Sequence, residues 1–348
     1  MKTWDVIVVG GGIIGLSLAI ELKKRGTQVL VVERGEPGRE ASYAAAGMLA
    51  ACGLETPAEM QPLATASARI YPEFVHELED ESGIKIDLRD RGTLLFPTAE
   101  EANQLAGSAP VEVGKFEPAL EHLSQAAFYF KEGTVDPRAL GTAALKAAKH
   151  RGVDISSGSQ VKEVVVENGR ASGVVTDKTS YAAGTVVNCC GAWAGHVSPI
   201  QFPTRPVRGQ MLAVAAPKLI QHVVRTPDVY LVPRSDGRIL IGSTLEEAGY
   251  DKRTDPAVIQ RMYRAAIRIL PALGQARVLE DWAGLRPGTP DNLPILGATK
   301  IPGYLVAAGH FRDGILLAPV TAHLMADIVT GIKPDFGISQ FSPARFRA

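Results

Sequence analysis

A glycine-rich turn between two apolar stretches lies within the first 33 residues, and it constrains the fold more than any other feature of the chain. Val6–Val9 is a β-branched run typical of a parallel strand buried on both faces. The pattern Gly-x-Gly-x-x-Gly follows at 10–15, and apolar residues at helical spacing continue through 13–24. Residues 28–32 form a second apolar run that ends in Glu33. This order predicts a strand, a helix and a strand at the start of a doubly wound α/β fold.

Each part of this unit suits a bound dinucleotide. Gly10 allows a tight turn, Gly12 lets a pyrophosphate approach the backbone, and Gly15 lets the helix pack closely on the strand. The helix N-terminus offers free N–H groups and a positive dipole end to phosphates. Glu33 is placed to accept hydrogen bonds from the adenosine ribose, which argues against NADP. The motif alone leaves NAD and FAD open.

Composition excludes several other classes of protein. The 348 residues carry 37 Lys or Arg and 37 Asp or Glu, so the net charge is zero and a basic nucleic-acid surface is not expected. The length suggests two domains. Neither a metal site nor a transmembrane helix is expected, because the histidines are scattered and no uncharged apolar run is long enough. Cys52, Cys189 and Cys190 form no disulfide framework, which favours a reducing, cytoplasmic location; the adjacent pair is expected to be core.

Two further segments favour FAD. Residues 42–48 are small and enter a predicted helix, so they can lie flat against a planar ring while the Ser42 hydroxyl reaches phosphate. A plain alanine-rich helix start explains these residues equally well. Near the C-terminus, an apolar strand at 304–308 and a glycine-flanked turn lead into a predicted amphipathic helix at 315–329. Its positive end would stabilise negative charge on a reduced flavin, although it also fits the last βα unit of a doubly wound sheet.

Four motifs beyond the N-terminal turn make the sequence resemble a known family. They are Ala-Ala-Ala-Gly-Met at 44–48, Val-Tyr-Leu-Val-Pro-Arg at 229–234, Trp-Ala-Gly-Leu-Arg-Pro-Gly at 282–288, and the run from Ala308 to Pro319. Together they resemble the FAD-dependent glycine oxidases of thiamine biosynthesis, within the D-amino-acid oxidase superfamily. The matches run in order from residue 5 to about residue 330.

The resemblance implies an α/β fold with a Rossmann-like FAD-binding domain assembled from three segments. These segments are expected at 1–86, 134–202 and 283–348. An inserted α+β substrate-binding domain, built on an antiparallel sheet, is expected at 87–133 and 203–282.

The chemistry of an amino acid substrate agrees with this resemblance. A planar guanidinium is the best bidentate partner for a carboxylate in a partly dry pocket. By resemblance, Arg286 is the carboxylate anchor and Tyr230 adds its hydroxyl to the same group. The alternatives are an ion pair of Arg286 with Asp281 or Asp291, and ordinary strand packing for Tyr230.

Other substrate and cofactor contacts are also implied by resemblance. Arg312 is expected at the substrate amine and the flavin, and Met48 and Leu245 at the substrate. Asp228 and Leu245 depart from the family pattern, which has a histidine and a methionine there, so the preferred amino acid stays open. The residues expected to contact FAD are Gly10, Gly12, Ile13, Ile14, Gly15, Glu33, Arg34, Ala41, Ser42, Ala46, Gly47, Met48, Val161, Gly191, Trp193, His310, Phe311, Arg312, Asp313, Gly314, Ile315 and Leu316.

The expected reaction is oxidative deamination of glycine or another small amino acid, with hydride passing from Cα to flavin N5. No strong enzymic base is needed once the amine is neutral. Oxygen would reoxidise the flavin to give peroxide, and the imine would leave for hydrolysis or for thiamine thiazole synthesis. The FAD is expected to be non-covalent because the turn at 309–314 has no cysteine.

Three alternatives stay open at this stage. One is a D-amino-acid or sarcosine-type oxidase, and another is a dehydrogenase that uses an acceptor other than oxygen. The third is a flavoprotein that binds FAD for stability within a larger assembly. The resemblance also suggests a homotetramer, with neither nucleic acid nor membrane as a partner.

Overall fold

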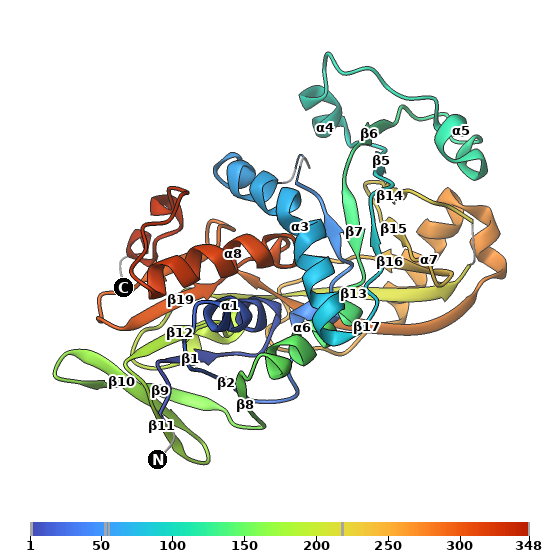
Figure 1. Ribbon diagram of the computed structural model, residues 1–348. Helices are drawn as coiled ribbons and strands as arrows, with labels where there is room; N and C mark the ends of the chain where they lie inside the picture. Colours follow the sequence, from blue (N-terminus) through green and yellow to red (C-terminus); the bar gives the residue numbers. More distant parts are fainter. Residues whose placement is uncertain (1–2, 52–53, 55, 217–218, 347–348) are drawn as a thin grey trace.

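The computed structural model describes residues 3–51, 54, 56–216 and 219–346; Cys52 lies outside this part. One half of the molecule is organised around a six-stranded sheet (Figure 1). All neighbours are parallel except one edge strand, β18, which is antiparallel to β19. In spatial order the strands are β18 (Ile295–Ala298), β19 (Tyr304–Ala308), β12 (Thr185–Asn188), β1 (Val6–Val9), β2 (Val29–Glu33) and β8 (Asp154–Ser157).

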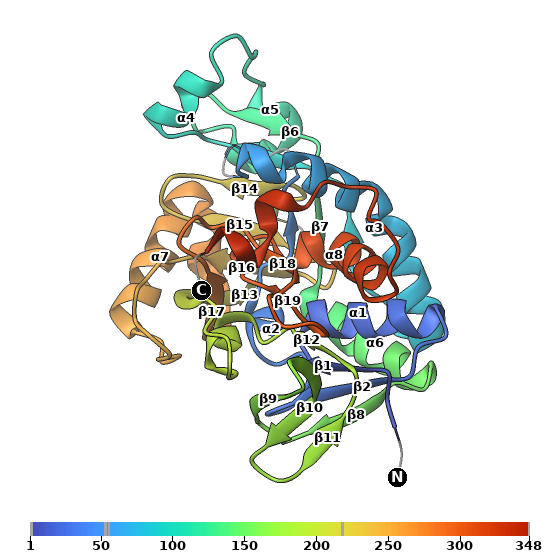
Figure 2. The ribbon, with the colours of Figure 1, turned by 90° about the vertical axis from the view of Figure 1, so that its left-hand side faces the viewer.

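The alternating side chains of β1 explain how this sheet is covered. Val6 and Val8 face a helical layer, whereas Ile7 and Val9 face a three-stranded antiparallel sheet on the opposite side (Figure 2). The helices are α1 (Ile13–Lys24), α3 (Gln61–Ser82), α6 (Pro137–His150) and α8 (Gly314–Val329). The small sheet contains β9 (Val161–Glu167), β10 (Arg170–Thr176) and β11 (Ser180–Ala182). The predicted α/β fold class is confirmed.

The helix expected at the C-terminal end is present but differs from the prediction. It was expected to be amphipathic, yet nearly all of α8 is buried, and His323 is its exposed residue before the last turn. The reason is that α1 and α3 both pack against it. Residues 42–48 were expected to enter a helix, but α2 (Ala41–Ala44) ends within this stretch and Ala45 is extended.

The other half of the molecule is organised around a seven-stranded sheet. Its neighbours are antiparallel except for the parallel pair β5 and β14. One face packs against α7 (Pro256–Ile269) and the segment around Leu120, and the other face carries Met211, Val232 and Leu240 toward Ala46. The strand order is β17 (Arg277–Gly288), β13 (Arg205–Ala215), β16 (Arg238–Gly242), β15 (Tyr230–Pro233), β14 (Val223–Arg225), β5 (Thr93–Leu95) and β6 (Phe128–Phe130).

A small sheet joins the two halves, and the short helices lie outside both large sheets. The predicted boundary at residue 283 does not end the second sheet, because β17 continues in register with β13 to Gly288. The division into domains otherwise stays a prediction. This sheet, which is separate from that of β9, β10 and β11, consists of β3 (Met48–Leu49), β7 (Gly133–Val135) and β4 (Leu88–Arg89). The short helices are α4 (Ala99–Gln104) and α5 (Val113–Phe116).

Candidate active site

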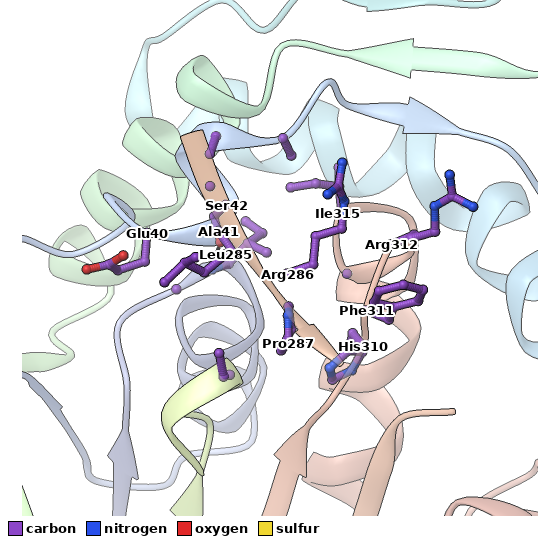
Figure 3. Close-up of a pocket in the computed structure, with 18 of the residues that line it drawn as sticks. Glu40, Ala41, Ser42, Leu285, Arg286, Pro287, His310, Phe311, Arg312 and Ile315 are labelled. Atoms are coloured by element: carbon purple, nitrogen blue, oxygen red, sulfur yellow. Dashed lines mark hydrogen bonds between the residues drawn. The ribbon is translucent and has the colours of Figure 1, made fainter. Parts of the chain in front are cut away.

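A cavity of about 350 Å³ lies between the two large sheets, at the carboxyl ends of β1, β2 and β12. This is where doubly wound folds bind their ligands, and the volume is typical of a small-molecule site. Figure 3 shows Glu40, Ala41 and Ser42 on one side of it and the turn from His310 to Arg312 on the other, with part of β17 between them.

The β1–α1 turn forms one end of this cavity. Gly10 has φ of +106°, and a Cβ on it would lie 2.5 Å from the Cys189 carbonyl oxygen. Gly12 lines the cavity, and a Cβ on it would meet the Ser42 hydroxyl at 3.4 Å. The Ser42 hydroxyl accepts a hydrogen bond from the Ile13 amide at 3.0 Å, at the start of α1. The turn therefore fits a pyrophosphate held by backbone amides and one hydroxyl.

Glu33 lies at the end of β2, beside this turn. Its two carboxylate oxygens accept from the amides of Gly11 at 2.7 Å and Gly35 at 2.9 Å. These bonds hold the carboxylate at the cavity wall, where each oxygen keeps a lone pair for a ligand hydroxyl. Next to it, the Arg34 guanidinium stacks on the Trp193 ring at 3.6 Å from its centroid. The stacked pair forms a flat wall suited to a nucleoside.

The turn before α8 forms the opposite wall. Phe311 has φ of +46°, and its amide donates to the Pro287 carbonyl at 2.9 Å, which ties the turn to β17. His310 is buried and hydrogen-bonded to the Thr321 hydroxyl at 3.1 Å; burial lowers its pKa to about 3, so the ring is neutral. The N-terminal end of α8 at Gly314 lines the cavity and turns its positive dipole end toward it.

Arg286 lies on the cavity-facing side of β17. Its Nη2 donates to the Ser243 hydroxyl at 2.6 Å and its Nη1 to the Thr244 carbonyl at 3.2 Å. A Cβ on Gly209 would lie 2.1 Å from Nη1, so the guanidinium crosses β13 only because that residue is glycine. The two carboxylates considered as alternative partners of Arg286 contact other residues. Asp291 pairs with Arg345 at 2.8 Å, and Asp281 accepts from the Thr254 hydroxyl at 2.6 Å.

Tyr230 follows the same arrangement on the neighbouring strands. A Cβ on Gly242 would lie 2.8 Å from its hydroxyl oxygen, so the ring rests on the glycine backbone of β16. Its hydroxyl donates to the Met211 sulfur at 3.7 Å. Glycines in β13 and β16 thus create the space in which the two predicted substrate residues lie. These glycines were not singled out in the sequence, because their role depends on which strands are neighbours.

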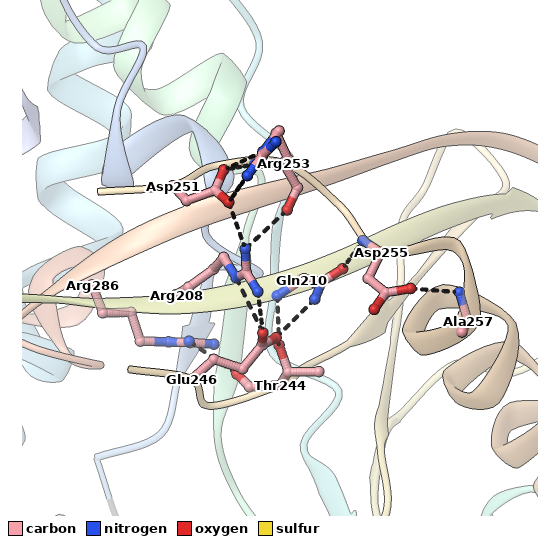
Figure 4. A network of polar contacts seen from close by, with 9 residues as sticks. All are labelled: Arg208, Gln210, Thr244, Glu246, Asp251, Arg253, Asp255, Ala257 and Arg286. Atoms are coloured by element: carbon pink, nitrogen blue, oxygen red, sulfur yellow. Dashed lines mark hydrogen bonds and ion pairs between the residues drawn. The ribbon is translucent and has the colours of Figure 1, made fainter. Parts of the chain in front are cut away.

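A polar network lies behind Arg286 (Figure 4). The Glu246 carboxylate accepts from the Thr244 hydroxyl, from Gln210 Nε2 at 2.8 Å and from Arg208 Nε at 3.1 Å. The backbone N–H of Gln210 in turn donates to the Thr244 hydroxyl at 2.9 Å. Burial alone would raise the pKa of Glu246, but the hydrogen bonds from Thr244, Arg208 and Gln210 lower it below its ordinary value. The network fixes the residue whose carbonyl accepts from Arg286.

The structure brings most of the predicted site residues to this cavity, but not all. Gly15 lies beneath the turn, where a Cβ would be 2.0 Å from the Gly10 carbonyl oxygen. Leu316 is buried among the helices, and Leu245 is 61% exposed outside the cavity. The predicted residues that line it are Gly10, Gly12, Ile13, Ile14, Glu33, Arg34, Ala41, Ser42, Ala46, Gly47, Met48, Val161, Gly191, Trp193, Tyr230, Arg286, His310, Phe311, Arg312, Asp313, Gly314 and Ile315.

Several cavity residues were not predicted as site residues. Arg225 and Ser243 line the cavity, the first on β14 opposite Tyr230 and the second directly after β16. Only the Gly-Ser-Thr run at 242–244 offered a signal for Ser243. Asp228 lies at the cavity and pairs with Arg268 at 3.2 Å, so its charge has a cationic neighbour.

Other kinds of site have little support in the described structure. No three His, Cys, Asp or Glu side chains among the described residues gather as a metal site requires. Cys189 is buried and Cys190 partly so, and both thiols are free. Burial raises the pKa of Cys190 to about 12, which makes it unreactive. In the described ranges, no helix combines the length and apolar character needed to cross a membrane.

Comparison with known proteins decides the family. The model of the DAO family, described as FAD dependent oxidoreductase, matches residues 5–328. The chain belongs to this family. The FAD dependent oxidoreductase fold explains the cradle at the β1–α1 turn, where Gly10 and Gly12 leave the backbone open to a pyrophosphate.

Individual relatives of this FAD dependent oxidoreductase are glycine oxidases and ThiO proteins. The glycine oxidase of Geobacillus kaustophilus is 35% identical over 368 residues, which cover 98% of this chain and 97% of that protein. The crystal structure of glycine oxidase from Geobacillus kaustophilus matches with a TM-score of 0.93 at 33% identity and covers 99% of both chains. The bifunctional protein ThiO/ThiG of Synechocystis sp. is 38% identical over 99% of this chain, which spans 54% of that relative's length.

Proposed function

We propose that this chain oxidises glycine or another small amino acid with FAD as its cofactor. One observation carries the proposal: Arg286 and Tyr230 both line the cavity, and Arg286 lies on the strand that passes between the two cofactor walls. A guanidinium in a partly buried site is the preferred partner for a carboxylate. The similarity to glycine oxidases supports the same substrate class.

The residues of this chain would act mainly by binding and orienting the substrate. Arg286 binds the carboxylate and Tyr230 donates to one of its oxygens. Arg312 borders the amine side, and Met48 limits the size of the side chain. Held in this way, Cα faces the cofactor end of the cavity, and such positioning accounts for a large share of catalysis in two-reactant steps.

The proposed reaction takes two electrons and two protons from the substrate. The amine loses one proton to solvent, and bound FAD supplies the acceptor for the hydride that leaves Cα. The imine product then hydrolyses to the keto acid and ammonia, or it is used to make the thiazole of thiamine. Molecular oxygen is the proposed final acceptor, which takes the two electrons and two protons to become hydrogen peroxide.

A second candidate keeps the cofactor and changes the electron acceptor or the substrate. The hydrogen cyanide synthase subunit HcnC of Pseudomonas aeruginosa is 32% identical and covers 99% of this chain and 97% of that protein. A dehydrogenase with an acceptor other than oxygen is one form of this second candidate. D-amino acids and sarcosine are further candidate substrates, because Asp228 lines the cavity where the family pattern has a histidine. A cytoplasmic location and a homotetramer are also proposals, and size-exclusion chromatography tests the second.

An anaerobic reduction screen tests the proposal. We expect glycine to bleach the bound flavin, and air to restore the colour with release of one peroxide per turnover. Sarcosine and D-alanine in parallel identify the preferred substrate. Bleaching without peroxide in air favours the dehydrogenase, and a flavin that none of the amino acids reduces contradicts the proposal.

Substitution of the anchor tests the role of Arg286. We expect Arg286→Gln to lower kcat/KM roughly a hundredfold, because a buried charged hydrogen-bond pair is lost. This corresponds to a loss of about 3 kcal/mol of transition-state stabilisation. Arg277→Gln is the matched control, since Arg277 starts the same strand and is exposed. An Arg286→Gln protein as active as the control would show that the substrate carboxylate binds elsewhere.

A further inference from the structure

Arg234 is a buried arginine that does not line the cavity. It follows β15 directly, and 4% of it is exposed. Its Nη2 donates to the Ala46 carbonyl, and within the described residues its Nη1 has no hydrogen-bond partner. Burial lowers its pKa to about 10, while Asp136 and Asp87 act in the opposite direction. Burying a guanidinium in this way costs free energy, so we expect Arg234 to have a role other than packing.

The two nearby carboxylates do not provide that reason, because both have other partners. Asp136 accepts from the Arg138 amide at 2.9 Å as the N-cap of α6, and it pairs with Arg238 at 2.9 Å. Asp87 accepts from the Ser235 amide at 2.9 Å and from the Ser235 hydroxyl at 2.6 Å. They lower the cost of the buried cation, but the side chain of Arg234 donates its hydrogen bond to the backbone carbonyl of Ala46.

The Ala46 carbonyl belongs to a segment, residues 44–48, that lines the cavity. Three of its carbonyls accept hydrogen bonds from three different parts of the fold: β17, the residue after β15, and β7. The Ala44 carbonyl accepts from Trp282 Nε1 at 3.0 Å, the Ala46 carbonyl from Arg234, and the Gly47 carbonyl from the Val135 amide at 2.8 Å. These contacts hold the segment in one backbone conformation, which is extended at Ala45 and has a positive φ at Gly47.

The fit at Gly47 shows how closely Arg234 approaches this segment. Gly47 has φ of +73°, and a Cβ there would lie 1.9 Å from the Val135 carbonyl oxygen and 3.1 Å from Arg234 Nη2. Gly47 is thus confined between the strand of Val135 and the guanidinium. Only the thickness of the segment separates the charge of Arg234 from the cavity.

We propose that Arg234 is a positioning residue for the cofactor: it fixes the Ala46 carbonyl, and its charge favours the negative charge that FAD gains on reduction. The inference rests on FAD occupying this cavity, as family membership implies. It adds a second source of positive potential to the N-terminal end of α8, from the opposite half of the molecule. Arg234 is not a catalytic residue, since the segment lies between it and the cavity.

Two variants separate the hydrogen bond from the charge. Arg234→Gln removes the charge and Arg234→Lys keeps it, and in both variants the donor nitrogen is fewer bonds from Cα than the arginine Nη2 that reaches the Ala46 carbonyl. We expect both to raise the FAD dissociation constant of the apoprotein at least tenfold, measured by flavin fluorescence. We expect only Arg234→Gln to lower the midpoint potential of the bound flavin, measured by dye equilibration. These readouts do not depend on turnover.

Arg238→Gln is the matched control. Arg238 starts the next strand, and its guanidinium pairs with the same Asp136 and with the exposed Asp236 instead of the 44–48 segment. It should keep the wild-type potential and FAD affinity. If Arg234→Gln also keeps both and only its melting temperature falls, Arg234 is purely structural and the proposal is wrong. If Arg234→Gln does not fold, wild-type FAD affinity in Arg234→Lys overturns the positioning role.

The outcome for Arg234 is separable from the proposed function. A wild-type protein that binds FAD but is not reduced by amino acids contradicts the proposed reaction and leaves the Arg234 measurements intact. Conversely, an active oxidase whose Arg234 variants keep wild-type affinity and potential contradicts only this inference.

Discussion

The Arg286 guanidinium lies across the backbone of Gly209, with only 2.1 Å between its Nη1 and the point where a Cβ would begin. The two residues sit on neighbouring strands, β17 and β13. The position of the proposed carboxylate anchor therefore depends on the absence of a side chain on a residue that has no chemistry of its own. This relationship gives a test of the site that leaves the arginine in place.

We expect Gly209→Ala to raise KM for the amino acid substrate by about ten- to a hundredfold, because misplacement of about 1 Å has effects of this size. The melting temperature should change little, since the displaced atoms are the end of a flexible side chain. Steady-state kinetics and thermal unfolding measure the two effects. Gly274→Ala is the control, because its Cβ would meet Ile267 at 3.9 Å, an ordinary contact. Unchanged KM in Gly209→Ala would mean that Arg286 does not bind the substrate.

The network behind Arg286 gives a second prediction. Glu246→Gln replaces an acceptor of several hydrogen bonds with an amide that turns one N–H₂ toward other donors. The Thr244 carbonyl, which accepts from Arg286, should shift. We expect a rise in KM of about fivefold, or about 1 kcal/mol, with a smaller change in kcat.

The neighbouring residue is the control for this variant. Glu247 forms an exposed ion pair with Arg205, so Glu247→Gln should leave both constants unchanged. Stability in acid provides a second readout. Because the pKa of Glu246 is lowered in the folded protein, its contribution is present above about pH 4.5 and lost as pH falls below that value. Glu246→Gln should therefore lose less stability than wild type in this range, and equal losses would contradict the role of the network.

The N-terminal unit could be predicted from the sequence almost to the residue, whereas the substrate side could not. The helix expected at 13–24 is observed at Ile13–Lys24, because its glycines, periodicity and strands are all local signals. The Arg286 site depends on β17, β13 and β16 lying side by side, although Gly209, Gly242 and Arg286 are far apart in the chain. No local pattern records which strands pair.

Burial also separates what a local pattern predicts from what the fold imposes. Leu245 was expected at the substrate by resemblance, yet it follows β16 on the outside and is 61% exposed. The C-terminal helix was expected to have a polar face, but it lies between α1 and α3 and is apolar nearly all round. Both differences come from tertiary contacts, which outweigh local preferences.

A pair of glycines within helices separates helix propensity from packing. Propensity alone predicts that Gly15→Ala and Gly141→Ala both stabilise the protein by about 1 kcal/mol. However, a Cβ on Gly15 would lie 2.0 Å from the Gly10 carbonyl oxygen, whereas a Cβ on Gly141 meets no atom within 4 Å. We expect Gly15→Ala to lower the melting temperature and weaken FAD binding, and Gly141→Ala to raise the melting temperature slightly. If Gly15→Ala behaved like Gly141→Ala, the close packing of α1 on the turn would be wrong.

The last prediction concerns the buried imidazole at the cofactor turn. Burial lowers the pKa of His310 to about 3 in the folded protein, against about 6.5 in an unfolded chain. Between these values the unfolded state binds one more proton, so stability is fully present above pH 6.5 and falls as pH drops toward 3. The slope from this residue is about 1.4 kcal/mol per pH unit.

Denaturant unfolding at several pH values, with and without excess FAD, should show a shallower slope in His310→Gln than in wild type. His150→Gln is the control, because His150 is exposed at the end of α6. An unchanged slope in His310→Gln would show that the imidazole is protonated or solvated in the folded protein, contrary to its burial beside Thr321.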